Sequence, residues 1–120
     1  IFPAWIDDAD REGLYALAEL FAYPSLYEGF GLPPLEAMAR GVPVITTDRG
    51  SLAEVAGQAA WLVDPLSVDA IATAIRELLS DGAERERLRA LGREQGARFS
   101  WELAAELTAA SYRRALSGAE

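Results

Sequence analysis

The chain of 120 residues contains no cysteine and no histidine, and both absences narrow its chemistry. Without cysteine it can form neither a disulfide scaffold nor a cysteine-ligated zinc site. Without histidine it lacks the side chain that most often acts as a general base or binds a metal. Any chemistry in this chain therefore depends on carboxylates, on backbone dipoles, or on groups that it does not itself contain.

Positive charge is also scarce. The net charge is −8, with 11 Lys and Arg against 19 Asp and Glu. Binding to nucleic acid or to an anionic membrane needs clustered Lys and Arg, so we expect no nucleic-acid partner. No apolar run approaches the roughly 18 residues that predict a membrane-spanning helix, and the first residues show no signal-peptide pattern. We expect a piece of a longer cytoplasmic protein, with peripheral attachment of the full-length protein to a membrane left open.

The chain contains enough apolar residues for one folded domain, since 51% are hydrophobic and 25% are charged. Short apolar runs that end in Pro, Asp or Ser alternate with helical patterns. We predict buried parallel strands over 20–25, 42–47 and 59–64. A further strand is predicted over 1–6, where Pro3 would confine it to an edge or an end of the sheet.

Helical patterns fill the intervals between these strands. The first helix has Asp8 and Asp10 as N-cap candidates, and Ser51 with Glu54 forms a predicted capping box. The predicted ranges are 11–19, Pro34 to just before Gly41, 51–57, 68–80 after Ser67, 83–95, and 101–116 after Ser100. Alternating strands and helices predict an α/β fold with right-handed crossovers, in which ligands bind beyond the carboxyl ends of the strands.

The segment "YEGFGLPPLE" (27–36) lies at that edge. Gly29 and Gly31 let the chain turn sharply and bring backbone N–H groups close to a ligand. The following helix points its positive end at the same place. Glu28 and Glu36 are hydrogen-bond acceptors on either side. Amide donors flanked by carboxylates suit a nucleotide sugar, which carries both phosphates and hydroxyls.

Simpler interpretations remain open at this point. Glu36 could pair with Arg40 one helical turn later, a surface contact of about 0.2–0.5 kcal/mol. Glu28 could be a solvated loop charge, and the glycines could serve the turn alone.

Residues 24–57, "PSLYEGFGLPPLEAMARGVPVITTDRGSLAEVAG", resemble the C-terminal domain of the retaining GT-B glycosyltransferases of family 4, also called the group 1 family. That family carries two Glu separated by seven residues, matched here by Glu28 and Glu36. The later "LVDP" and "RFSWE" segments fit as well. The resemblance covers nearly the whole chain. It implies a Rossmann-like parallel sheet flanked by helices over 1–120, an incomplete C-terminal half of a GT-B fold that lacks its first strands and the N-terminal acceptor domain.

The resemblance also implies a function. It indicates a fragment of an enzyme that transfers a sugar from a UDP-, GDP-, ADP- or dTDP-sugar to an undetermined acceptor, with retention of anomeric configuration and without a metal or cofactor. Glu28 is implied as the catalytic-site residue, in contact with the donor sugar. Donor binding is implied for the backbone of Gly29, Phe30, Gly31 and Leu32 and for Glu36, which would accept from the ribose hydroxyls.

Two features of the family have no match here. Its diphosphate-binding Arg and Lys lie upstream of "IFPAWI", and its acceptor domain is absent. Because neutralising the leaving diphosphate is the main electrostatic demand of the reaction, we expect the chain alone to be inactive. Two alternatives remain: a non-catalytic nucleotide-sugar-binding module, or a related GT-B enzyme such as a sugar-nucleotide epimerase or a glycogen-synthase-like polymerase.

The sequence also predicts which residues pack in the core and which strand forms an open edge of the sheet. We expect residues 43–46 and Trp61 in the core, and Phe99 with Trp101 packed at the last helix. In the Rossmann order 3-2-1-4-5-6, the resemblance places 1–6 at strand 3 and 20–25 at strand 4. The missing strands 1 and 2 would leave 20–25 as an apolar edge, which favours pairing. We expect either a second copy of the chain or residues 1–6 to cover it.

Overall fold

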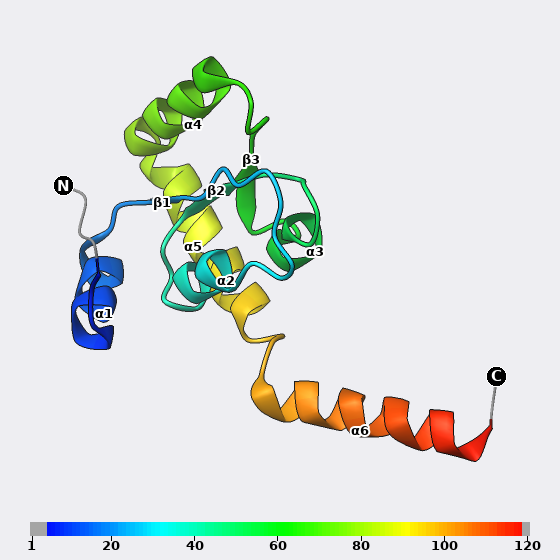
Figure 1. The fold of residues 1–120 in the computed structure, drawn as a ribbon. Coiled ribbons are helices and arrows are strands. Elements are labelled where there is room, and N and C mark those ends of the chain that lie inside the picture. The colour runs from blue at the N-terminus through cyan, green and yellow to red at the C-terminus, as the bar shows by residue number, and fades with distance from the viewer. Residues whose placement is uncertain (1–4, 119–120) are drawn as a thin grey trace.

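The computed structural model describes residues 5–118, which form three strands and six helices. The predicted α/β class is confirmed, although the strands are shorter than predicted. In chain order the elements are α1 (Asp8–Leu17), β1 (Phe21–Ala22), α2 (Leu32–Ala39), β2 (Val44–Thr46), α3 (Leu52–Ala56), β3 (Ala60–Leu62), α4 (Val68–Ser80), α5 (Gly82–Gly96) and α6 (Trp101–Ser117) (Figure 1).

The three strands form one parallel sheet in the order β1-β2-β3. Phe21 lies opposite Val44, and Val44 lies opposite Ala60. The predicted neighbour relations of the three strands are therefore confirmed. Most of the strand expected over 1–6 lies outside the described residues, and Trp5 and Ile6 have no strand structure.

The central strand is buried on both faces. Every residue from Val42 to Thr47 is buried, as expected for 43–46. Successive side chains point to opposite faces, so Val44 and Ile45 enter two different hydrophobic clusters. A strand covered on both sides reads as a continuous apolar run, which is why the sequence identifies it.

Different helices pack against the two faces of the sheet. One cluster unites α1, α2 and α3 with the sheet, through Tyr15, Ala37, Met38, Val42, Val44, Ala56 and Ala59. The other unites α4 and α5 with the opposite face, through Ile45, Val63, Ala74, Leu78 and Leu88, with Trp61 partly buried against it. The core role expected for Trp61 is thus partial.

Two glycines of α5 allow it to lie close against α2. A Cβ added at Gly92 would lie 3.3 Å from the carbonyl oxygen of Met38. One added at Gly96 would lie 2.9 Å from the Cα of Ala39, a distance that real Cβ atoms do not show. This contact fixes the helix that carries Glu36, and sequence periodicity gave no sign of it.

The structure confirms two of the predicted capping interactions at helix starts and contradicts two others. Ser67 and Ser100 cap α4 and α6 as predicted, each accepting from an amide three residues on. The expectation for α1 is wrong, because Asp7, not Asp8 or Asp10, is the N-cap and accepts from the Asp10 amide. The capping box at α3 is also wrong, because the Ser51 hydroxyl makes no cap bond.

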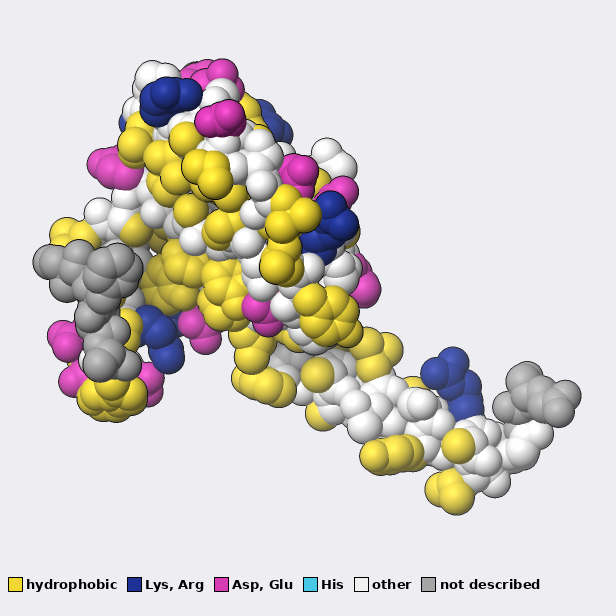
Figure 2. All heavy atoms as spheres, turned by 45° about the horizontal axis from the view of Figure 1, so that its top comes forward, with side chains coloured by type: hydrophobic (Ala, Val, Ile, Leu, Met, Phe, Trp, Pro, Cys, Tyr) yellow, Lys and Arg dark blue, Asp and Glu magenta, His cyan; other side chains and the backbone are white. Residues whose placement is uncertain are grey.

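Helix α6 projects away from the body, and none of its residues is buried (Figure 1). Figure 2 shows hydrophobic side chains along this arm. Trp101 is 81% exposed, so the packing role expected for it is wrong. Phe99 does pack, edge-on against Phe30 at 5.9 Å between ring centroids. Within residues 5–118, no helix is both long and apolar enough to cross a membrane.

We expect Gly96→Ala to lower the free energy of unfolding by about 1–3 kcal/mol, because the added methyl overpacks the α2–α5 contact. Gly13→Ala is the matched control, since a Cβ at this position in the interior of α1 would meet no described atom within 4 Å. It should raise stability by about 0.5–1 kcal/mol through helix propensity alone. Urea denaturation measures both, and equal effects would show that the close contact does not matter.

Candidate functional site

The candidate site is the loop between β1 and α2, at the carboxyl edge of the sheet. Hydroxyl groups from β2 and the segment after it hold its backbone in place. Thr46 Oγ1 donates to the Tyr23 carbonyl at 3.0 Å, and Thr47 Oγ1 donates to the Ser25 carbonyl at 2.9 Å. Both threonines are fully buried. The loop is therefore shaped by the neighbouring strand and not by its own sequence alone.

Ser51 anchors the middle of the same loop. Its hydroxyl lies 2.9 Å from the carbonyl oxygen of Glu28 and 2.8 Å from that of Phe30. Both carbonyl oxygens are thus within hydrogen-bond distance of the same hydroxyl. The hydroxyl accepts no hydrogen bond from an amide of α3.

The Glu28 carboxylate is oriented by two donors from the preceding residues. Its Oε1 accepts from the Tyr23 hydroxyl at 2.6 Å and from Ser25 Oγ at 2.9 Å. The hydrogen bond from Tyr23, and next that from Ser25, hold the pKa of Glu28 below its usual value. Glu28 is thus an oriented, ionised group, so the alternative of a freely solvated loop charge is wrong.

The two glycines of the loop differ in what fixes them. Gly31 has a φ of 102°, and a Cβ there would lie 2.7 Å from Leu52 Cδ2, so the fold itself requires glycine. At Gly29 no atom of residues 5–118 lies within 4 Å of the Cβ position. The space beside Gly29 is open, which leaves its backbone accessible.

The amino end of α2 offers fewer donors than the sequence suggested. Gly31 is the N-cap, and Pro33 and Pro34 occupy the first turn, where each lacks an N–H group. Of the first three helical residues, only Leu32 has a backbone N–H. The expected row of amide donors, Gly29, Phe30, Gly31 and Leu32, therefore ends at the first residue of the helix.

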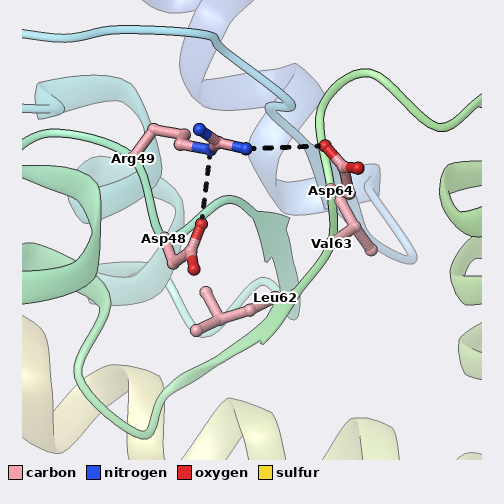
Figure 3. A pocket seen from close by; sticks show the side chains of 5 residues that line it. All are labelled: Asp48, Arg49, Leu62, Val63 and Asp64. Carbon is pink, nitrogen blue, oxygen red and sulfur yellow. Dashed lines mark ion pairs between the residues drawn. The ribbon is translucent and has the colours of Figure 1, made fainter.

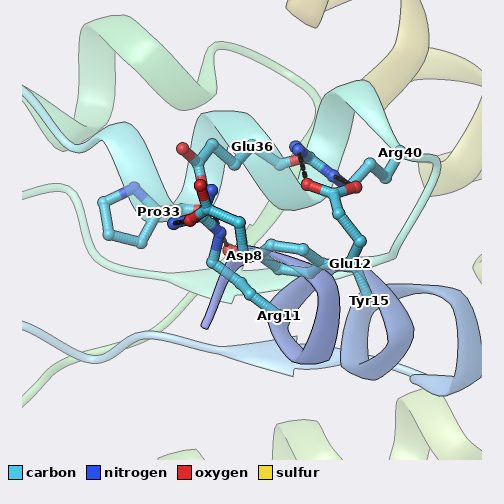
Figure 4. A network of polar contacts seen from close by, with 7 residues as sticks. All are labelled: Asp8, Arg11, Glu12, Tyr15, Pro33, Glu36 and Arg40. Atoms are coloured by element: carbon cyan, nitrogen blue, oxygen red, sulfur yellow. Dashed lines mark hydrogen bonds and ion pairs between the residues drawn. The ribbon is translucent and has the colours of Figure 1, made fainter. Parts of the chain in front are cut away.

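Glu36 lies on α2, beside α1 (Figure 4). Its Oε2 is 3.5 Å from the Tyr15 hydroxyl and 3.7 Å from Arg11 Nε, both long contacts, and 35% of the side chain is exposed. The alternative pairing of its carboxylate with Arg40 is wrong. Arg40 instead binds the carboxylate of Glu12 and donates to the Glu36 backbone carbonyl at 2.9 Å.

Tyr15 contacts both the polar side chains of Glu36 and Arg40 and the hydrophobic core. Its ring lies 5.8 Å from that of Phe21, and the Arg40 guanidinium lies 5.0 Å from its centroid. Burial, and then the Glu36 carboxylate, raise the pKa of Tyr15. The phenol therefore stays protonated and can donate. The Tyr15 contact to Glu36 was not predicted, because α1 and α2 are separated by β1 and the loop.

A pocket of about 350 Å³ opens beyond β2 and β3, lined by Asp48, Arg49, Leu62, Val63 and Asp64 (Figure 3). Arg49 lies between two carboxylates, 3.6 Å from Asp48 and 3.8 Å from Asp64. These exposed pairs contribute little to stability but tie together the loops after the two strands. Asp48 follows β2 and Asp64 follows β3, so both lie at the carboxyl edge of the sheet.

The sequence of the chain matches a known protein family. The model of the family described as glycosyl transferases group 1 matches residues 1–95. The chain belongs to the group 1 glycosyl transferases. It is 47% identical over 112 residues to O-antigen chain mannosyltransferase B of Escherichia coli, covering 93% of this chain and 29% of that protein. It is 35% identical over 120 residues to a glycogen synthase of Mycobacterium tuberculosis, covering 98% of this chain and 29% of that protein.

A solved structure extends the likeness to the fold. The sucrose-phosphate synthase of Thermosynechococcus elongatus superposes with a TM-score of 0.85 at 34% identity. The match covers 99% of this chain and 31% of that one. This group 1 chain thus spans less than a third of each of these three relatives, and its three-stranded sheet is part of a GT-B domain.

Within the described part of this group 1 chain, no side chain contacts the carboxylates of both Glu28 and Glu36. Glu28 is held by residues that follow β1, and Glu36 makes long contacts with α1. The family resemblance singled out both carboxylates and the glycines between them, and their roles stay predictions. It missed Tyr23, Ser25 and Ser51, and only the hydroxyls clustered near the ends of β1 and β2 hinted at them.

We expect Ser51→Ala to lower the free energy of unfolding by about 0.5–1.5 kcal/mol, the usual net value of a hydrogen bond. Amide hydrogen exchange should become faster in the loop from Glu28 to Gly31. Ser117→Ala is the control, because among the described residues that exposed hydroxyl binds only the Arg114 carbonyl in the last turn of α6. Unchanged exchange in the loop would show that Ser51 does not hold it.

Proposed function

We propose that this chain is the donor-binding part of a retaining glycosyltransferase that transfers a sugar from a nucleotide sugar to an acceptor. The observation that carries the proposal is the group 1 loop, with an oriented carboxylate at Glu28, an accessible backbone at Gly29, and Glu36 one turn into the following helix. The chain spans less than a third of its named relatives, so the activity belongs to a longer protein.

Each site residue has a distinct proposed role. Glu28 contacts the donor sugar as the catalytic-site carboxylate. The open space beside Gly29 supports close approach of the donor to the backbone of Gly29, Phe30, Gly31 and Leu32. The partial exposure and long contacts of Glu36 leave its carboxylate able to accept hydrogen bonds from ribose hydroxyls.

The names of the relatives favour a hexosyl donor. Besides O-antigen chain mannosyltransferase B, an MMP alpha-(1->4)-mannosyltransferase of Mycolicibacterium hassiacum is 40% identical over 116 residues, covering 93% of this chain and 28% of that protein. We therefore place nucleotide-activated mannose first among the UDP-, GDP-, ADP- and dTDP-sugars to be tested. Glucosyl donors come second because of the glycogen synthase.

The chain alone is proposed to be inactive. None of its described cations contacts the loop carboxylate Glu28, and the family's diphosphate-binding Arg and Lys belong upstream of residue 1. A leaving diphosphate would therefore lack the positive charge that stabilises it. The alternative is a non-catalytic nucleotide-sugar-binding module. Sugar transfer measured with the full-length protein would rule it out.

In the full-length enzyme, we expect Glu36→Ala to weaken donor binding about ten- to a hundredfold, because a hydrogen bond to a charged group contributes about 1.5–3 kcal/mol. The free energy of unfolding should hardly change, since the Glu36 side chain makes only long contacts with the described residues. Isothermal titration calorimetry with the nucleotide sugar measures the affinity. Glu12→Ala is the matched control, because it removes the same charge from the neighbouring face of α1. Equal donor affinity in the two variants would remove Glu36 from the donor site.

We also propose that the isolated chain self-associates along β1. In the described residues β1 pairs only with β2, and an edge strand favours pairing with a second copy. Upstream strands would cover the other side of β1 in the full-length enzyme.

Analytical ultracentrifugation of the isolated chain should therefore show concentration-dependent dimers. Ala22→Lys, in β1, should weaken them, because a lysine on an edge strand opposes pairing. Ala72→Lys, at an exposed position of α4, adds the same charge and should leave the dimer intact. A chain that stays monomeric at every concentration would refute self-association.

A further inference from the structure

The Glu28 carboxylate is held on one of its two oxygens only. The Tyr23 hydroxyl at 2.6 Å and the Ser25 hydroxyl at 2.9 Å both donate to Oε1. No described residue donates a hydrogen bond to Oε2. Two donors on one oxygen fix the direction of the carboxylate and leave the second oxygen unused by the protein.

The two donors are themselves anchored to the central strand. The Tyr23 amide donates to the Ile45 carbonyl at 2.8 Å, and the Tyr23 carbonyl accepts from Thr46. Its ring stacks on Phe21, with centroids 5.9 Å apart and planes 14° apart. The Ser25 carbonyl accepts from Thr47. A side chain supported by groups that are themselves fixed is held to the narrow tolerance that catalysis requires.

The hydroxyl of Ser25 has two acceptors within reach. It lies 3.2 Å from the Tyr27 carbonyl and 2.9 Å from Glu28 Oε1. A hydroxyl has one proton, and the bond to a carboxylate is the shorter and stronger. The proton therefore goes to Glu28, and both hydroxyls act on the same carboxylate oxygen.

We propose that Tyr23 and Ser25 are positioning residues, whose hydroxyls hold Glu28 Oε1 so that Oε2 is presented to the donor sugar. This inference rests on the proposed function, because it assigns a purpose to the orientation of Glu28. Neither residue touches the donor in this arrangement, and both act through Glu28.

The same bonds keep the carboxylate ionised. Tyr23 and then Ser25 lower the pKa of Glu28, while its partial burial opposes them; no charged side chain contributes among the described residues. The bond in turn raises the pKa of Tyr23, so the phenol remains a donor. Removing the Tyr23 hydroxyl therefore raises the pKa of Glu28. If the ionised form is active, the acidic limb of the rate profile moves to higher pH.

The test compares Tyr23→Phe and Ser25→Ala with wild type in the full-length enzyme, measuring kcat and donor KM from acidic to neutral pH. We expect kcat at neutral pH to fall about ten- to a hundredfold in Tyr23→Phe, the range for a misplaced catalytic group. Donor KM should stay nearly constant, and the acidic limb should move to higher pH. Ser25→Thr retains a hydroxyl and should restore most of the activity that Ser25→Ala loses.

Tyr27→Phe is the control, because Tyr27 belongs to the same loop but its side chain is 77% exposed. It should leave kcat and the pH profile unchanged. A Tyr23→Phe enzyme with wild-type kcat and an unmoved acidic limb overturns the inference while the proposed function stands. The inference is also overturned if the activity of the Tyr23 and Ser25 variants falls only in proportion to their loss of melting temperature. A wild-type enzyme that binds the donor but transfers no sugar overturns both together.

Discussion

The buried strand β2 is the constraint on which the rest of this structure depends. It pairs with a strand on each side, and its alternate side chains enter the two hydrophobic clusters. Where it ends, Thr46 and Thr47 are fully buried and must satisfy their hydroxyls internally. They do so by binding carbonyls of the loop after β1. The core thus determines the backbone of the candidate site.

A second contact places the other half of the site. Helix α2 follows the loop and carries Glu36, and α5 lies against it, tightly at Gly92 and with no room for a side chain at Gly96. Gly31 turns the chain into α2 in a left-handed conformation and packs against Leu52. The direction of α2, and with it the place of Glu36, follows from backbone-to-backbone packing and not from a charged pair.

The predictions that succeeded and those that failed differ in the sequence distance of the interactions involved. Ser67 and Ser100 cap their helices, because a capping serine needs an amide only three residues away. Ser51 has the same local pattern, but its hydroxyl binds carbonyls more than 20 residues earlier. Trp101 was expected to pack on the strength of its hydrophobicity, but α6 has no partner within the described residues and leaves it exposed.

By itself, the sequence determined the α/β class, the three parallel strands and the family, and within the loop it singled out Glu28, Glu36 and the glycines. Each of these depends on short-range patterns: apolar runs, residues that favour turns, and fixed spacing. Only the tertiary structure decided which groups hold the carboxylates. Tyr23 and Ser25 reach Glu28 because β2 shapes the loop, and Tyr15 and Arg11 reach Glu36 because α1 packs beside α2. Such contacts arise from the packing of separate elements, which no local pattern encodes.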